Sequence, residues 1–306
     1  MRLSFMRKTT RSCLTLASVI AATGCSGMVA NLAADALGGG GGTFASDDDP
    51  ELVREAIPFG LKTLEGLLAD SPKNGTLLLA AGSGFTQYAY GFVQADAEEL
   101  EPTDLSRANV AFARARKLYA RGLEYSLRGL EARHPGLRAA FARERTLTLV
   151  DTDKDDVPFL YWAAAALGGR IAISKDDMLA VGRLGEFEAL AYRALALDEA
   201  YAQGAIHELL IAYESRSAAM GGSPAKAKEH YERALALSGG HKLAPLVTWA
   251  EVAAVPAQDR KLFDALLARV LGFDVDSAPT LRLVNLIAQR RARFVASRAP
   301  DLFLEE

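Results

Sequence analysis

The sequence predicts an all-α protein in which helical hairpins stack into an α-solenoid. Apolar residues recur at helical spacing in almost every segment, and no segment shows the alternating apolar and polar residues of a convincing strand. Proline and glycine stand at regular intervals where helices would begin and end. Two segments also repeat one another at an offset of 40 residues, which is typical of stacked helical hairpins.

The first 24 residues have the features of a signal peptide. A leader with four basic residues precedes the uncharged apolar run "CLTLASVIAATG". The stretch Ala22-Thr23-Gly24-Cys25 is similar to the lipobox of bacterial lipoproteins, although Ala22 stands where Leu is usual. We therefore predict a lipidated Cys25, with a plain secretory signal cut nearby or an uncleaved anchor as alternatives. The run is too short and too weakly apolar to predict a transmembrane helix.

A lipidated cysteine and flexible tether are predicted over 25–48, and a helical domain over 49–306. The Gly-rich stretch "GGGGGTFASDDDP" cannot offset the entropy of ordering. Cleavage before Cys25 leaves 31 of the 35 basic residues against 38 acidic ones, a formal net charge of −7, so nucleic acid is not an expected partner. A single remaining cysteine allows no intramolecular disulfide, and stability must come from a packed core.

Local signals set the helix ends. Pro50, Pro224 and Pro279 suit first turns, and the first two follow a capping Asp or Ser. Stops are predicted at "DSPKNG" (70–75), "RHPG" (133–136), "GG" (221–222) and "SGGH" (238–241). The clearest helix, 105–132, carries one stripe that must face a partner helix. Its members are Leu105, Ala108, Phe112, Ala115, Tyr119, Gly122 and Leu130.

The repeated segments can be compared with the tetratricopeptide (TPR) pattern. Residues 193–197 match residues 233–237 at the offset of 40. Small and aromatic residues within 206–213 are spaced like those in the first helix of a TPR unit, and those within 227–234 are spaced like those in the second helix. The connection between them is about five residues longer than in the TPR pattern. We therefore predict a TPR-like solenoid of about four degenerate helical pairs, with another helical bundle as the alternative.

The stretch "DVPFLYWAAAALGGRIAIS" (156–174) is the most apolar part of the folded region. Its thirteen uncharged residues from Val157 to Gly169 are too few to span a membrane. A helix that is apolar on all sides is buried among other helices, so this segment is predicted either as a central core helix or as a helix partly lining an apolar cavity.

The sequence carries no convergent catalytic or metal-binding pattern, and no cofactor or metal is predicted. None of the four histidines has a ligand-spaced partner, and position 211 is Ile where a zinc-protease helix needs His. "AGSGF" around Ser83 does not match the G-x-S-x-G pattern of a nucleophile elbow, because Ala81 stands where the pattern needs Gly. "DTDKDD" (151–156) has the alternate carboxylates of a calcium loop but not its Gly and Glu, so these carboxylates are better explained as favouring the next helix N-terminus.

A basic face is predicted on the 105–132 helix. Between 107 and 145 there are ten basic and three acidic residues. Glu124 is placed to pair with Arg128, so the face is either simply solvated or a surface for an acidic partner, an anionic ligand or membrane headgroups. Its arginines recur every seven residues: Arg107, Arg114, Arg121 and Arg128.

Four segments together resemble the TatT family, the lipoprotein T components associated with TRAP transporters. They are "NGTLLLAAGSGFTQYAYGFVQ", "RARKLYARGLEYSLRGLEARHPG", "DVPFLYWAAAALGGRIAIS" and "GAIHELLIAYESR". The likeness covers roughly residues 50–300. Its motifs consist of packing residues, and the family offers no catalytic residue to transfer.

The resemblance implies a non-enzymatic, lipid-anchored periplasmic protein that associates with the solute-binding P subunit of a TRAP transporter. It also implies a homo-oligomer with an apolar channel through each subunit, and segment 157–173 near that channel. We favour the outer membrane, and expect a small apolar or carboxylate ligand. A TPR-type scaffold for outer-membrane or cell-wall machinery is the alternative. The candidate ligand- or partner-binding residues are Tyr88, Phe159, Tyr161, Trp162, Arg170 and Tyr213.

Overall fold

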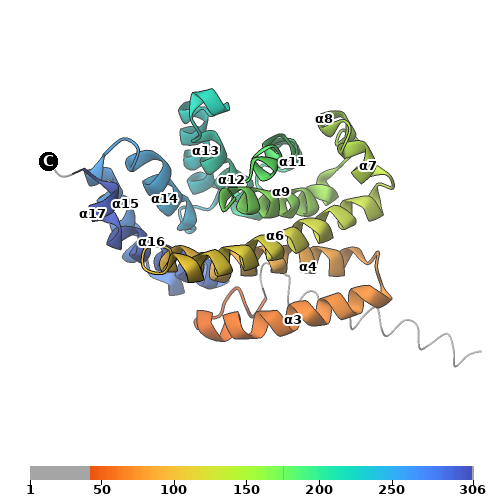
Figure 1. The fold of residues 1–306 in the computed structure, drawn as a ribbon, viewed down its shortest axis with the longest axis horizontal. Helices are drawn as coiled ribbons and strands as arrows, with labels where there is room; N and C mark the ends of the chain where they lie inside the picture. Colours follow the sequence, from red (N-terminus) through yellow and green to blue (C-terminus); the bar gives the residue numbers. More distant parts are fainter. Residues whose placement is uncertain (1–41, 175, 305–306) are drawn as a thin grey trace, which may run out of the picture.

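The computed structural model describes residues 42–174 and 176–304, and all of its regular elements are helices (Figure 1). The prediction of an all-α fold is confirmed. The predicted Cys25 and most of the tether lie outside the described residues. The α-helices are α3 (Pro50–Asp70), α4 (Gly75–Tyr88), α5 (Ala95–Leu100), α6 (Leu105–Arg133), α7 (Leu137–Phe141), α8 (Arg145–Thr148), α9 (Val157–Ala172), α10 (Met178–Val181), α11 (Leu184–Leu197), α12 (Ala205–Glu214), α13 (Pro224–Leu237), α14 (Ala244–Trp249), α15 (Arg260–Leu271), α16 (Arg282–Ser297) and α17 (Ala299–Leu302).

Shorter helical turns connect or continue these helices. Two are π-helical, η1 (Ala89–Gln94) between α4 and α5, and η5 (Ala250–Ala254) after α14. π-Helical turns are rare and frequently lie at functional sites. The 3₁₀ turns are η2 (Lys154–Asp156), η3 (Tyr201–Gln203), η4 (Ala218–Met220), η6 (Val275–Ser277) and η7 (Pro279–Leu281).

The predicted caps and stops lie where the sequence indicated. Asp49 accepts hydrogen bonds from the amides of Glu51 and Leu52 at the start of α3, and Ser223 caps α13 ahead of Pro224. α6 ends at Arg133, directly before the "HPG" sequence. The proline at 279 begins a 3₁₀ turn rather than an α-helix, and α16 follows at Arg282.

Consecutive long helices pack on one another in chain order. α4 packs between α3 and α6, α9 packs between α6 and α11, and α12 packs on α13. The predicted stripe of α6 is buried at Ala108, Ala115, Tyr119, Gly122 and Leu130. Leu105 was assigned to this stripe wrongly, because its side chain at the first turn is 59% exposed.

α6 approaches α4 closely at the "AGSGF" sequence. A Cβ on Gly82 would lie 2.5 Å from Ser126 Oγ, and a Cβ on Gly122 would lie 2.3 Å from Thr86 Oγ1 and 3.1 Å from the Gly82 carbonyl oxygen. These two glycines let the backbones meet. The small residues around Ser83 therefore serve helix packing.

The segment 157–172 is a core helix, as predicted. α9 buries Val157, Leu160, Ala163, Ala164 and Leu167 against α6 and α11. Among the described residues no helix is long and apolar enough to cross a membrane.

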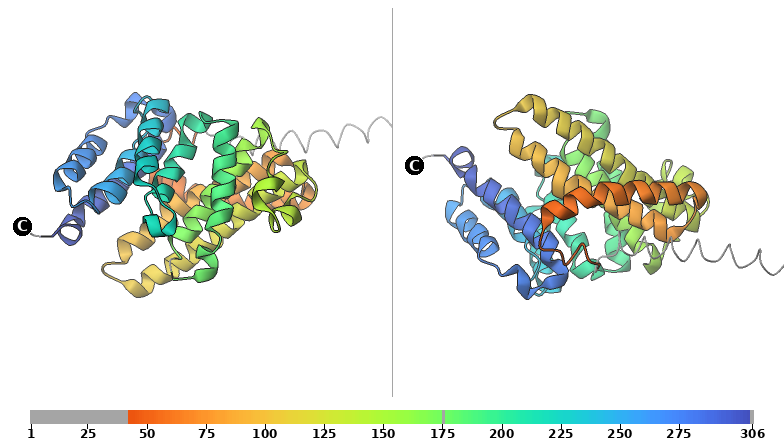
Figure 2. Two further views of the ribbon diagram at one scale, coloured as in Figure 1. Left: turned by 90° about the horizontal axis from the view of Figure 1, so that it is seen from above. Right: turned by 90° about the horizontal axis from the view of Figure 1, so that it is seen from below.

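The C-terminal helices return to the start of the chain (Figures 1 and 2). Leu283 N donates to the Ala45 carbonyl oxygen at 3.1 Å, and Arg282 Nη1 donates to that of Ser46 at 2.6 Å. Phe44 packs on the core, so ordered contacts begin before the predicted domain start at Asp49. α16 also contacts α3 and, through Arg290, the carboxylates of α5. The packed helices thus form a closed circuit, while the finer prediction of a TPR-like solenoid stays a prediction.

Candidate functional site

The predicted basic face of α6 lies over aromatic rings. The guanidinium of Arg114 is 5.6 Å from the Tyr88 ring centroid, that of Arg121 is 5.4 Å from Phe85, and that of Arg128 is 5.3 Å from Tyr125. Such contacts contribute about 0.5–1 kcal/mol each at exposed sites. Arg114 and Arg121 thus take part in packing α6 beside α4, whereas Arg128 lies over a ring of α6 itself and donates to the Pro72 carbonyl oxygen at 2.9 Å.

Two further contacts complete this face. Arg107 is exposed, and its backbone amide is capped by Asp104. Glu124 receives both Nη atoms of Arg138, at 2.9 and 2.7 Å, so its expected pairing with Arg128 is wrong. A docking role for the basic face stays a prediction.

Three of the six candidate ligand residues are buried in the core. Tyr88 is 5% exposed and its hydroxyl accepts from Arg114 Nη2 at 3.2 Å. Phe159 packs where Gly129 leaves room for its ring. Tyr213 stacks near Phe187, and burial raises its pKa to about 12. Their contacts are with other helices of the protein.

Tyr161, Trp162 and Arg170 are only half-buried on α9. The Tyr161 ring lies edge-on to Trp162 at 4.8 Å and 5.2 Å from the ring of Tyr201. Burial raises the pKa of Tyr161 well above its usual range, and Glu208 of α12 adds to this shift. This end of α9 therefore presents aromatic rings toward α12.

Tyr90 is the residue on which distant elements converge. It lies in the π-helical turn η1 and is 55% exposed. Loss of hydration nevertheless raises the pKa of Tyr90 to about 12, an effect opposed by Arg291 and reinforced by Glu251, Glu98 and Glu208. Charged groups of α5, α12, η5 and α16 therefore act on the Tyr90 hydroxyl.

The charged neighbours of Tyr90 form a connected network. The Tyr119 hydroxyl donates to Gln94 Oε1 at 2.5 Å, and Gln94 Nε2 donates to Glu98 Oε1 at 2.9 Å. Arg291 of α16 pairs with Glu98, and its Nη2 lies 2.6 Å from Glu251 Oε1 in η5. Arg291 thus joins α16 directly to η5, and joins it to η1 through Glu98 of α5 and Gln94.

We call this group of residues the Tyr90 cluster. Its residues come from η1, α5, α9, α12, η5 and α16, which are spread over the whole circuit of helices. Sequence analysis found Tyr161 and its neighbour Trp162 but missed the other members, because no local pattern joins them. The cluster consists of Tyr90, Glu98, Tyr161, Glu208, Glu251 and Arg291.

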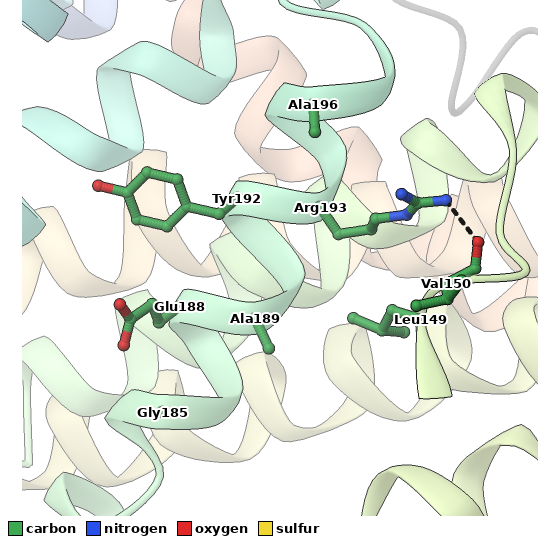
Figure 3. Close-up of a pocket in the computed structure, with 8 residues that line it drawn as sticks. All are labelled: Leu149, Val150, Gly185, Glu188, Ala189, Tyr192, Arg193 and Ala196. Carbon is green, nitrogen blue, oxygen red and sulfur yellow. Dashed lines mark hydrogen bonds between the residues drawn. The ribbon is translucent and has the colours of Figure 1, made fainter. Parts of the chain in front are cut away.

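A separate pocket of about 390 Å³ lies beside α11 (Figure 3). Leu149 and Val150 form one side of it, and Ala189, Tyr192 and Arg193 of α11 contribute the other. Arg193 Nη2 donates to the Val150 carbonyl oxygen at 2.8 Å. None of the sequence-predicted ligand residues lines this pocket.

One carboxylate of the "DTDKDD" stretch, that of Asp156, joins the end of α6 to the start of α9. Asp156 is fully buried, bonded to Arg133 Nε at 2.5 Å and His134 Nε2 at 2.8 Å, and it accepts from the Asp153 amide at 2.8 Å. Among the described residues no three His, Cys, Asp or Glu side chains are grouped to hold a metal ion.

Two histidines meet between α12 and α13. His207 Nδ1 and His230 Nδ1 are 2.8 Å apart, and the side chains are 4% and 7% exposed. His207 Nε2 lies 3.3 Å from Glu199 Oε1. Burial lowers the pKa of both rings, an effect that Glu199 opposes at His207 and that His207 itself reinforces at His230. Sequence analysis found no partner for either residue, because their contact is tertiary.

This pair is expected to make stability fall in mild acid. An unfolded histidine binds its proton near pH 6.5, whereas these folded ones bind it only at lower pH. Below about pH 6.5 the unfolded state holds more protons, so the free energy of unfolding decreases, by roughly 1.4 kcal/mol for each unit of pKa lowering. Between pH 8 and pH 5, the free energy of unfolding measured with urea should decrease less steeply in the H207Q/H230Q variant than in the wild type. An equally steep decrease in both proteins would contradict this account.

A closed circuit of packed helices defines an all-α protein. The sequence matches the TRAP transporter T-component family over residues 46–303. This chain belongs to that family, whose members are transporter accessory components. It is also 30% identical over 267 residues to an uncharacterized protein of Treponema pallidum (strain Nichols), with 86% of this chain and 83% of that protein aligned. The resemblance drawn from the four sequence segments is confirmed.

Proposed function

We propose that this chain is the accessory T subunit of a TRAP-type transporter that binds the periplasmic solute-binding subunit and holds a small ligand at the Tyr90 cluster. Membership in the T-component family supports association with such a transporter. The observation that supports the ligand role is Tyr90, an aromatic side chain that is 55% exposed and subject to the charges of groups on α5, α12, η5 and α16. Ligand sites typically combine aromatic walls with a few polar groups.

The proposed location is the periplasmic face of a membrane, with the outer membrane favoured and Cys25 as the lipidated residue. Residues 44–46 contact α16 and the core, so the tether reaches the folded part on the side where α16 meets α3. Self-association into a homo-oligomer belongs to the same proposal, with the family resemblance as its support.

Crosslinked capture of the tagged lipoprotein from its native envelope, followed by mass spectrometry, tests the partner. We expect recovery of a periplasmic solute-binding subunit. Recovery of wall or outer-membrane assembly proteins without a solute binder would contradict the proposal and favour the scaffold alternative.

Substitutions test whether Tyr90 and Trp162 take part. Tyr90→Ala and Trp162→Ala are expected to reduce ligand retention by the captured complex several-fold, because each removes an aromatic contact worth about 1 kcal/mol or more. Leu179→Ala is the control, since Leu179 lies on α10 and is 86% exposed. Equal ligand retention by all three variants would remove the site assignment.

A further inference from the structure

The contact between His207 and His230 lies where two apolar cores meet. α12 belongs to the first core, with α4, α6, α9 and α11, through residues such as Ile206. α13 packs between α12 and α14 (Figure 1), and its Tyr231 packs on the second core, which α14, α15 and α16 form. The histidine pair therefore joins the last helix of the first core to the first helix that contacts the second. α16 also reaches both cores.

α13 buries little else against its neighbours. Its buried residues are Ala227, His230 and Ala234, which lie on one face of the helix. At the start of α12, a Cβ on Gly204 would lie 3.3 Å from the Ala234 Cα, so the two backbones are close there. Small side chains bury little apolar area. His230, the largest side chain that α13 buries, therefore carries much of the contact with α12.

Glu199 determines which ring nitrogens carry protons. His207 Nε2 lies 3.3 Å from Glu199 Oε1 and has no closer partner among the described residues. The hydrogen bond from Arg233 lowers the pKa of Glu199 to about 2, so this carboxylate is ionised and can only accept. We assign the proton of His207 to Nε2, because that nitrogen faces the carboxylate. His207 Nδ1 then accepts, and His230 Nδ1 donates to it across 2.8 Å.

This arrangement tolerates one added proton but not two. A first proton can bind His230 Nε2, and the imidazolium still donates through Nδ1 to His207. A second proton would have to bind His207 Nδ1, where it would point at the N–H of His230 only 2.8 Å away. The hydrogen bond would be lost and two positive rings would repel each other at side chains that are 4% and 7% exposed.

The surrounding charges compensate one added proton. Glu214 is 3% exposed and accepts from the Tyr192 hydroxyl, and the Tyr192 ring centroid lies 6.3 Å from that of His230. Glu208 pairs with Lys242 before α14. The carboxylates near the pair are Glu199, Glu208, Glu214 and Glu229, and the cations are Lys226, Arg233 and Lys242. Four negative and three positive groups leave a net charge of −1.

We propose that the His207–His230 pair is an acid-operated latch between the two apolar cores. It takes up one proton while α12 and α13 stay in contact, and a second proton separates α13 from α12. Separation lets the second core move relative to the first about α16, which reaches both. This device goes beyond the proposed function and depends on neither the transporter partner nor the ligand.

Hydrogen exchange followed by mass spectrometry locates the opening in the full chain. Between pH 7.5 and pH 5, after correction for intrinsic exchange rates, protection of the α13 amides is expected to fall at least about tenfold, because the open state binds more protons than the closed one. Protection of the α6 amides should stay constant. Constant protection in α13, or an equal fall in α6 and α13, would overturn the proposal.

Variants connect the opening to the two rings. The H207Q/H230Q variant should keep α13 protection constant over the same pH range. His241→Gln is the matched control, because His241 is exposed just beyond α13 and its loss should leave the acid response unchanged. An unchanged acid response in the folded double variant would overturn the assignment.

Glu199→Gln provides a second variant at a side chain that is 44% exposed. It removes the charge that compensates the first proton, so α13 is expected to open at higher pH than in the wild type. This variant keeps both histidines and tests the latch even if the double variant fails to fold. Opening at the same pH as in the wild type would contradict the role of Glu199.

Nitrogen-15 NMR of protein labelled at its four histidines reads the proton positions. At pH 7.5 we expect His207 to be protonated at Nε2 and His230 at Nδ1. As the pH falls, one ring should become doubly protonated before α13 loses protection. The opposite tautomers, or two doubly protonated rings in a protein whose α13 is still protected, would each overturn the proposal.

Discussion

Replacing Asp156 by asparagine is expected to lower the free energy of unfolding by about 1.5–3 kcal/mol. The carboxylate is fully buried and joins Arg133 and His134, at the end of α6, to the start of α9. Asparagine keeps the size of the side chain but leaves the Arg133 guanidinium without its buried counter-charge. Urea unfolding at pH 7, followed by circular dichroism, measures the difference.

Asp155→Asn is the matched control, since the neighbouring carboxylate is exposed and its loss should change stability by less than about 0.5 kcal/mol. Burial alone would raise the pKa of Asp156, but hydrogen bonds from the Asp153 amide, His134 and Arg133 outweigh it and lower the pKa. The stabilisation is therefore present above the unfolded pKa of about 4 and lost as pH falls through the folded value. Asp156→Asn and wild type should converge in strong acid; a constant difference down to pH 2 would argue against ionic stabilisation.

Gly122→Val is expected to destabilise the protein by about 3 kcal/mol or more. A Cβ at this position would lie 2.3 Å from Thr86 Oγ1 and 3.1 Å from the Gly82 carbonyl oxygen, and the latter is backbone that cannot rotate away. Relief requires α4 and α6 to separate along their contact. The loss should appear in both the thermal midpoint and the urea midpoint.

Gly66→Ala provides the opposite control within the same group of helices. Gly66 lies in α3, is exposed, and has no atom within 4 Å of an added Cβ. Alanine there should stabilise the helix by about 0.5–1 kcal/mol through reduced backbone entropy. If Gly122→Val were tolerated as well as Gly66→Ala, the close approach of α4 and α6 would not be a determinant of the fold.

Much of the fold could be predicted because helix ends depend on adjacent residues. Asp49, Asn74 and Ser223 cap helices through their own side chains. Leu105 shows the limit of this approach, since its spacing fits the buried stripe of α6 although its place in the first turn leaves it exposed. Periodicity predicts which side of a helix is buried, but it does not predict where the partner helix ends.

The candidate site could be predicted only in part. The apolar stretch around Trp162 identified Tyr161 and Trp162, while Tyr88, Phe159 and Tyr213 proved to pack in the core. The arginines of α6 were found correctly as a periodic face, but their aromatic partners on α4 lie on another helix. A single sequence does not indicate which aromatic residues will lie beside charged groups of distant helices.

The sequence by itself determined the all-helical class, the capped ends of its main helices and its family, because these depend on local hydrogen bonding, spacing and motifs. The tertiary structure decided the Tyr90 cluster, the Asp156 ion pairs and the His207–His230 contact. Arg291 pairs with Glu98 and Arg290 with Asp96 only because α16 returns to α5. The charges and rings that face one another are set by that closure.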